Sequence, residues 1–237
     1  MKIQSSVTPS IFIEAHERKS IGQAETALQK LASKPRGNSL LAHIERLSTN
    51  GRSLRINVTG AHLDSTARPA LSVMQAVALG IPDNDLDPEN NAKATELASW
   101  VDGRRGVGTS AVIDWNPSQY PEVDAAGKPR VSDNEGLAFI SLAHELVHGY
   151  RMMKGKYAGG SSDRYSEGTP AALEEDRAVG LGKYAGKQLS ENGVRQEHGL
   201  PLRTQYRAGT PIHDDDSDIG EITFGAAPER GDSDDDF

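Results

Sequence analysis

Residues 132–153 read SDNEGLAFISLAHELVHGYRMM, and this stretch decides the fold that we expect for the chain. Ser132 or Asp133 can cap a helix, and apolar or imidazole side chains then recur at helical spacing. The face that they define carries Leu137, Ile140, His144, Val147 and His148. The pattern predicts an amphipathic helix that runs to about Met153 and ends at Gly155.

The centre of this helix is the segment His144-Glu145-Leu146-Val147-His148. Residues four apart lie on one helix face, so His144 and His148 can direct ring nitrogens at a single ion. Glu145 is offset around the helix, which places its carboxylate beside the open position of the metal. We expect one zinc ion per chain, with a zinc-bound water that Glu145 activates for attack on an amide. The less specific alternative is two ordinary histidines on an amphipathic helix.

A catalytic zinc site needs a third protein ligand. The chain has no cysteine, and the three-histidine form is absent because Arg151 and Lys154 occupy the required positions. A further helix is predicted by Thr169 as its cap and Pro170 at its first position. This helix carries the consecutive acidic residues Glu174, Glu175 and Asp176. A carboxylate from it would complete a gluzincin-type site, and a solvated acidic face is the alternative.

The remaining patterns predict an α+β fold. Two amphipathic helices are indicated, over residues 21–33 and from residue 39 to a break at Asn50-Gly51. Strands are indicated at 54–58 and 109–115, and we expect the second to be an edge strand that binds extended substrate. A small twisted sheet would pack on the active-site helix, with a mostly helical C-terminal half. The region 60–100 carries no motif.

We expect three parts along the chain. Residues 1–20 lack lasting periodicity, which indicates a flexible leader and a possible secretion signal. Residues 21–207 would form the metallopeptidase domain, and residues 208–237 are rich in Gly and Asp, which favours a disordered acidic tail.

The net charge of -8 argues against a nucleic-acid partner, because binding to phosphates needs a basic surface. No stretch approaches the roughly 20 apolar residues of a membrane-spanning helix. We therefore expect a soluble monomer that acts on a protein and binds neither nucleic acid nor membrane.

Three motifs in order resemble known proteases. Glu174-Glu175 followed by Arg177-Ala178-Val179-Gly180, after a His-Glu-Leu-Val-His helix, resembles the paired-glutamate motif of the clostridial neurotoxin light chains. The segment Arg203-Thr204-Gln205-Tyr206 resembles their Arg-x-x-Tyr segment. In size, and in the run from Glu191 to Tyr206, the chain is more similar to the NleD-like type III effector metalloproteases. The resemblance covers about residues 109–206 and implies a zincin-like fold.

The resemblance also implies a role for each matching residue. Glu174 would be the third zinc ligand, and Glu175 would orient a ligand or pair with Arg203. Arg203 and Tyr206 would stabilise the oxyanion of the tetrahedral intermediate, a role that suits a fixed cation and a phenol donor. For Arg203 and Tyr206 the alternative is ordinary surface packing.

The biology implied by the resemblance is a protease delivered by a type III secretion system into the host cell cytoplasm. There it would cleave host signalling proteins such as MAP kinases. Two other classes remain open: a peptidase toxin module that acts on bacterial proteins, and a non-catalytic binding protein stabilised by zinc.

Overall fold

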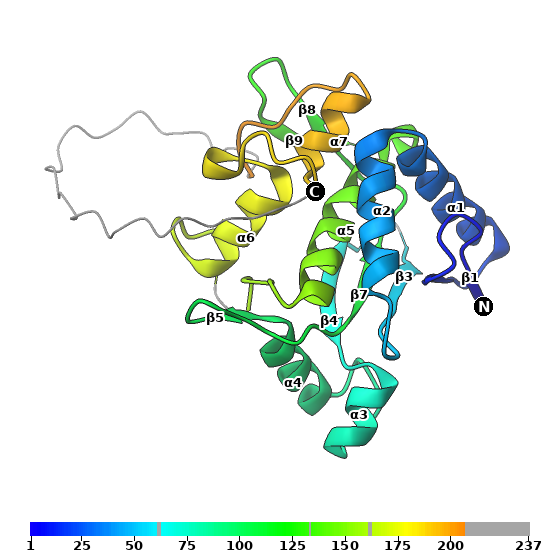
Figure 1. The fold of residues 1–237 in the computed structure, drawn as a ribbon. Helices are drawn as coiled ribbons and strands as arrows, with labels where there is room; N and C mark the ends of the chain where they lie inside the picture. The colour runs from blue at the N-terminus through cyan, green and yellow to red at the C-terminus, as the bar shows by residue number, and fades with distance from the viewer. Residues whose placement is uncertain (61–62, 133, 161–162, 207–237) are drawn as a thin grey trace, which may run out of the picture.

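The computed structural model describes residues 1–60, 63–132, 134–160 and 163–206. Within these ranges the chain forms seven α-helices, a five-stranded mixed sheet and two small two-stranded sheets (Figure 1). The α+β class expected from the sequence is confirmed. The helices are α1 (Arg18–Ala32), α2 (Pro35–Leu47), α3 (Val73–Leu79), α4 (Pro88–Ala98), α5 (Phe139–Lys154), α6 (Pro170–Val179) and α7 (Glu191–Glu197).

The main sheet has the strand order β1-β2-β3-β7-β4. Its strands are β1 (Lys2–Gln4), β2 (Ile11–Glu14), β3 (Leu54–Val58), β7 (Ser110–Trp115) and β4 (Thr66–Ala70). Strands β2, β3 and β7 run parallel, while β1 and β4 pair antiparallel at the two sides. The small sheets pair β5 (Trp100–Val101) with β6 (Arg104–Arg105), and β8 (Tyr120–Val123) with β9 (Pro129–Ser132). The strands expected at 54–58 and 109–115 are thus confirmed.

The first residues of the chain belong to the sheet, so the expectation of a flexible leader over residues 1–20 is wrong for this region. Ile11 and Ile13 are fully buried, and strand β2 pairs in parallel with β3. The segment is too short to show periodicity, and its partner strand lies about forty residues further along the chain. Whether it also serves as a secretion signal stays a prediction.

The expectation that the strand at 109–115 forms an edge is also wrong. Strand β7 pairs with β3 on one side and with β4 on the other. Residues 66–70, from the region without a motif, therefore provide the outer strand.

Helix α5 is the centre of the molecule. It contacts β4 and β7 on the sheet side and α1, α2, α6 and α7 on its other sides. Gly149 allows the close approach to the sheet, since a Cβ atom there would lie 2.8 Å from Leu54 Cδ1. The buried apolar residues of the sheet and of α5 belong to one hydrophobic cluster. Helix α5 is therefore held rigidly against the sheet.

The helices expected at 21–33, after 39 and after Thr169 are all present, and a further helix, α7, follows Ser190. The start of α5 differs from the expectation, because Ser132 ends strand β9 and pairs with Tyr120. A short 3-10 turn over Glu135–Leu137 then leads into α5 without a side-chain cap. Residue 133 and the expected acidic tail, 208–237, lie outside the described residues. In the part that the structure describes, no helix is long and apolar enough to cross a membrane.

Candidate metal centre and active site

The two histidines of α5 lie side by side, and His144 also lines a cavity. Their Nε2 atoms are 3.1 Å apart, and their rings meet edge to face at an interplanar angle of 78°. Both side chains are buried. The helical spacing therefore brings His144 and His148 together as the sequence predicts.

A third donor comes from α6. This helix starts where Thr169 Oγ1 accepts a hydrogen bond from the backbone N–H of Ala172, with Pro170 at its first position. Its orientation brings Glu175 Oε2 to 3.1 Å from His144 Nε2 and 3.2 Å from His148 Nε2. The three side chains converge on one point, and in the described residues they are the group that could hold a metal ion. Two imidazole nitrogens and one carboxylate oxygen are a donor set that suits zinc.

Glu174 lies beside this group and does not share its centre. Its Oε1 contacts His148 Nδ1 at 3.4 Å and Arg151 Nε at 2.8 Å, while its Oε2 accepts the backbone N–H of Ala158. These contacts differ from the expectation that Glu174 is the ligand and that Glu175 supports it. Neighbouring residues on a helix point about 100° apart, and here Glu175 reaches both Nε2 atoms while Glu174 reaches only Nδ1 of His148.

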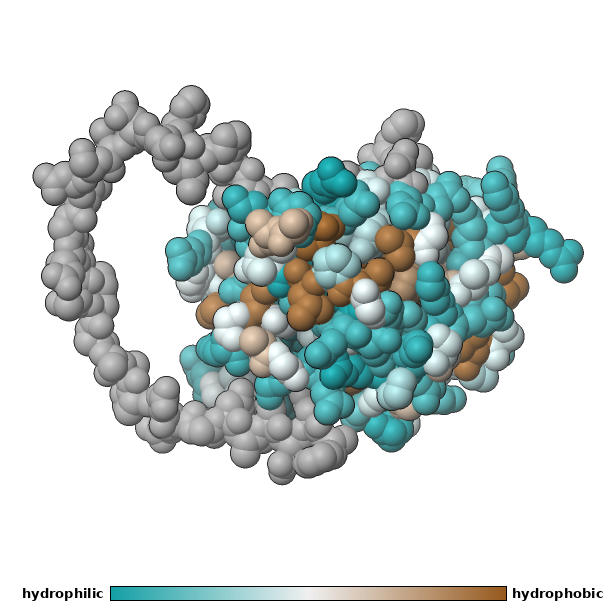
Figure 2. Space-filling model, turned by 90° about the horizontal axis from the view of Figure 1, so that it is seen from above, coloured by the Kyte–Doolittle hydropathy of each residue, from teal (hydrophilic) through white to brown (hydrophobic). Residues whose placement is uncertain are grey.

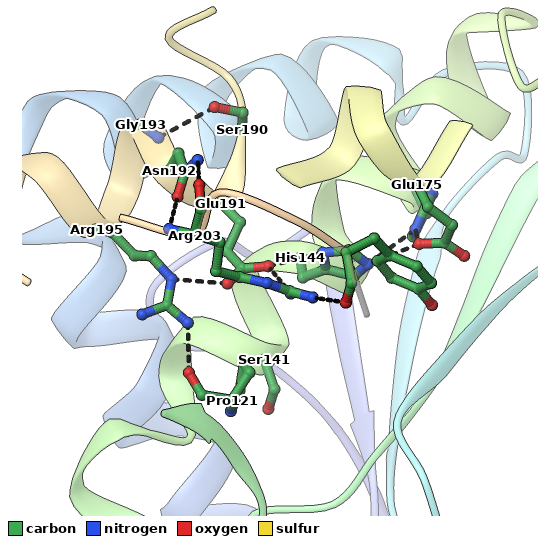
Figure 3. Close-up of polar contacts among 12 residues, drawn as sticks. Pro121, Ser141, His144, Glu175, Ser190, Glu191, Asn192, Gly193, Arg195 and Arg203 are labelled. Carbon is green, nitrogen blue, oxygen red and sulfur yellow. Dashed lines mark hydrogen bonds and ion pairs between the residues drawn. The ribbon is translucent and has the colours of Figure 1, made fainter. Parts of the chain in front are cut away.

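Glu191, at the start of α7, is a functional candidate that the sequence reasoning missed. Its Oε2 lies 3.0 Å from His144 Nδ1, and its side chain is fully buried. Arg195 donates to its Oε1 and Arg203 to its Oε2, each at 2.7 Å (Figure 3). The sequence signal was a serine cap followed by an acidic residue, which also describes an ordinary helix start. Each histidine thus has a carboxylate on its second ring nitrogen.

Arg203 and Tyr206 also reach the site, from the extended chain after α7. Arg203 is buried; besides Glu191 it bonds the backbone oxygen of Tyr206, and its own backbone is fixed by Asn192. The Tyr206 ring stacks near His144, with centroids 6.2 Å apart and an interplanar angle of 18°. Both residues predicted from the resemblance therefore lie next to the first histidine.

Burial and neighbouring carboxylates shift the pKa values of the site strongly. Burial lowers the pKa of His144, but hydrogen bonds with Glu175 and Glu191 outweigh it and raise the pKa to about 9. The pKa of His148 is also raised well above its ordinary value, by Glu174 and Glu175 against the effect of burial. The carboxylates around the two imidazoles therefore favour positive charge at this point. A divalent cation would replace that positive charge at the same point.

Glu145 is in a different position. Burial raises its pKa above the ordinary value of a glutamate, since the lowering by the two histidines is smaller. Its side chain is mostly buried but lines the cavity together with His144. A carboxyl group with a raised pKa at a cavity floor is suited to accept and return a proton.

The cavity has a volume of about 770 Å³. Thr66 at the start of β4, Tyr120 of β8, Tyr165 and Tyr206 form part of its walls. Seen from above, the protein surface is mainly hydrophilic, with a band of hydrophobic residues across its middle (Figure 2). The size and the mixed lining fit a short stretch of polypeptide.

Comparison with known proteins finds a family and several similar structures. The model of the Peptidase_M91 family, described as an effector protein, matches residues 16–206. No curated protein matches the chain. The catalytic domain of Clostridium botulinum neurotoxin serotype F is 18% identical, with a TM-score of 0.39 over 74% of this chain and 45% of that one. The botulinum neurotoxin serotype HA light chain is 13% identical, with a TM-score of 0.38 over 62% of this chain and 46% of that one. The chain thus spans less than half of these light chains.

Proposed function

The chain belongs to the Peptidase_M91 family of effector proteins, and from this we propose that it is a zinc-dependent endopeptidase. The observation that carries the proposal is the convergence of His144, His148 and Glu175 on one point. His144 and the neighbouring Glu145 also line an open cavity. Three protein donors with space beside them are typical of catalytic zinc sites, whereas structural zinc sites are closed by four.

We propose Glu175 as the third ligand, in place of Glu174. When bound, zinc supplies a Lewis acid that polarises a carbonyl oxygen and acidifies water. Glu191 would accept the Nδ1–H of His144, and Glu174 would accept the Nδ1–H of His148. These bonds leave both Nε2 atoms unprotonated and directed at the shared point, which is the form that a metal requires.

Glu145 would act as the general base and then as the general acid. At the cavity floor it would take a proton from water that attacks the peptide carbonyl, and it would return the proton to the leaving amine. Its raised pKa supports both steps, because the group has to bind the proton for part of the reaction. A glutamine of the same shape cannot do so.

Arg203 and Tyr206 would stabilise the negative oxygen that forms on the carbonyl. The guanidinium of Arg203 is held by Glu191, and the Tyr206 ring lies against His144, so both lie near the reacting groups. A pre-positioned cation and a phenol donor cost little reorganisation in the transition state. We therefore propose that Arg203 and Tyr206 stabilise the transition state, in addition to the ligand set given above.

The family description supports an effector that acts on a protein substrate. We propose further that the protein is secreted by the type III route into the host cell cytoplasm. Host signalling proteins such as MAP kinases are the substrates that we expect there. The Thr66 end of the outer strand β4 borders the cavity, so we place the extended substrate chain beside it.

The proposal is tested by incubating wild-type protein and the Glu145→Gln variant with host cell extract and with bacterial extract. Mass spectrometry of new protein termini should show cleavage of host proteins by the wild type alone. Cleavage restricted to bacterial proteins would favour a toxin module. If a chelator lowers thermal stability while no extract shows new termini, zinc would be purely structural and the proposal would fail.

A further inference from the structure

The β5–β6 hairpin exposes aromatic and basic side chains outside the cavity. Trp100 is 40% exposed, and Val101 and Val107 are more exposed still. Arg104 and Arg105 are exposed, and in the described part of the chain neither side chain pairs with a carboxylate. Such a combination is enriched at protein-binding surfaces, where tryptophan and arginine provide much of the binding energy.

The hairpin has two unequal faces. Trp100 pairs with Arg105 and Val101 with Arg104, and directly opposed residues of an antiparallel pair point to the same side. Lys156 Nζ lies 5.5 Å from the centre of the Trp100 ring. One face therefore presents an indole beside Arg105, and the other presents a valine beside Arg104. We call the first, made of Trp100 and Arg105, the tryptophan face.

The backbone joins this hairpin to the metal centre. Trp100 N–H donates to Tyr157 O at 2.9 Å, and Tyr157 N–H donates to Ala98 O at 3.0 Å. The next residue, Ala158, donates its N–H to Glu174, and the Tyr157 ring meets the His148 ring edge to face. The tryptophan face thus sits on a segment that contacts the ligand shell. It lies toward the end of α5 that is opposite the cavity, because Gly106 bonds Gly155.

From this placement and charge we propose that the tryptophan face is a docking site for an acidic segment of the protein substrate. An apolar side chain in that segment would pack on the indole, and a flanking carboxylate would pair with Arg105. The inference rests on the proposed peptidase function for its purpose, but the binding itself needs no catalysis. An anionic membrane is the alternative partner for these cations, and the vesicle sample described below distinguishes it from the peptide.

The test uses the fluorescence of the full chain. Of its two tryptophans, Trp115 is 1% exposed, so acrylamide quenching reports mainly on Trp100. The probe is a short peptide with glutamates on both sides of a central leucine, and its lysine counterpart is the negative control. The glutamate peptide should reduce the acrylamide quenching of Trp100 fluorescence in the wild type, and by the same amount in Glu145→Gln. The lysine peptide should not.

The matched variants are the two arginines of the same hairpin. Arg105→Glu should weaken the peptide affinity at least about ten-fold, since it places like charges together. Arg104→Glu makes the same change of charge on the other face and should weaken it much less. Arg18→Glu with Lys19→Glu, at the start of the distant α1, should leave it unchanged. Equal losses from both hairpin variants, or no loss, would overturn the proposal.

Two further measurements test whether something other than an acidic substrate segment binds the tryptophan face. The chain's own acidic residues, Asp214–Asp216, Asp232 and Asp234–Asp236, are one alternative occupant of the face. A protein that ends at Tyr206 would then show more quenching of Trp100 than the full chain, which would contradict the proposal. Protection by phosphatidylserine vesicles but not by the peptide would likewise contradict it. In cleavage assays, Arg105→Glu should lower kcat/KM for the folded substrate and spare a short peptide that spans the scissile bond.

Discussion

Two arginine–carboxylate networks lie in different surroundings, one at the metal centre and one on the sheet. In the first, Glu191 binds Arg195 and Arg203, and the side chains of Glu191 and Arg195 are 0% exposed. In the second, Asp85 binds Arg55 and Arg68 at 2.6 and 2.7 Å, with side chains that are 18–25% exposed. Similar distances therefore occur in quite different solvent environments.

The difference in solvent exposure indicates what each network contributes. A buried carboxylate with two guanidinium partners has little contact with water, so losing one partner leaves a charge without compensation. Its Oε2 also holds His144, which ties the charges to the metal centre. The sheet network joins β3, β4 and the loop before α4, and water can replace its contacts. The first network should therefore affect stability and zinc binding, and the second only stability.

The largest effect should follow from Glu191→Ala. The substitution leaves the buried guanidinium of Arg195 without its carboxylate, which should cost about 3–5 kcal/mol of unfolding free energy. It also removes the acceptor for His144 Nδ1 and should weaken zinc binding by roughly 10–100-fold. Urea unfolding with chelator and a zinc titration measure the two effects. A loss below 1 kcal/mol with unchanged zinc affinity would show that the networks do not differ.

A smaller effect is expected at Asp85. Burial raises the pKa of this carboxyl, but hydrogen bonds with Arg55 and Arg68 outweigh it, so the pKa lies below the ordinary 3.8. The ionised form therefore stabilises the fold above about pH 4, and this contribution is lost as the pH falls through the native-state pKa.

Asp85→Asn should accordingly cost roughly 1 kcal/mol near pH 6. The difference from wild type should shrink below about pH 4, while zinc affinity stays unchanged. Urea unfolding at a series of pH values tests this. A difference that is constant down to pH 2 would contradict the assigned role of the charge.

The smallest effect should come from the exposed pair of Lys93 and Glu96 on α4, which are 2.7 Å apart. A pair of this kind, three residues apart on a helix surface, contributes about 0.2–0.5 kcal/mol. Lys93→Ala should therefore change the urea midpoint very little. If Lys93→Ala lost as much unfolding free energy as Asp85→Asn, solvent exposure would not determine how much each of these ion pairs contributes to stability.

The sequence predicted what depends on local spacing. His144 and His148 are brought together by the helix repeat alone, and the Thr169–Pro170 signal placed the glutamate-bearing helix. The choice between Glu174 and Glu175 depends on the rotation of α6 against α5. That rotation is set by tertiary packing, which no local pattern encodes.

Long-range pairing explains the remaining differences. Strand β2 is recognisable only beside β3, and β7 loses its edge only because residues 66–70 pair with it. Glu191 acquires its role from a contact that spans 47 residues. Its burial depends on Arg195 and Arg203, so a single acidic residue in the sequence gives no sign of it.

The most direct test of the central claim is the turnover of Glu145→Gln protein whose zinc content matches the wild type. The account predicts one zinc ion per chain and a cleavage rate lower by about 10²–10⁴-fold, because only proton transfer is lost. A fully zinc-loaded Glu145→Gln protein that cleaves at the wild-type rate would contradict it.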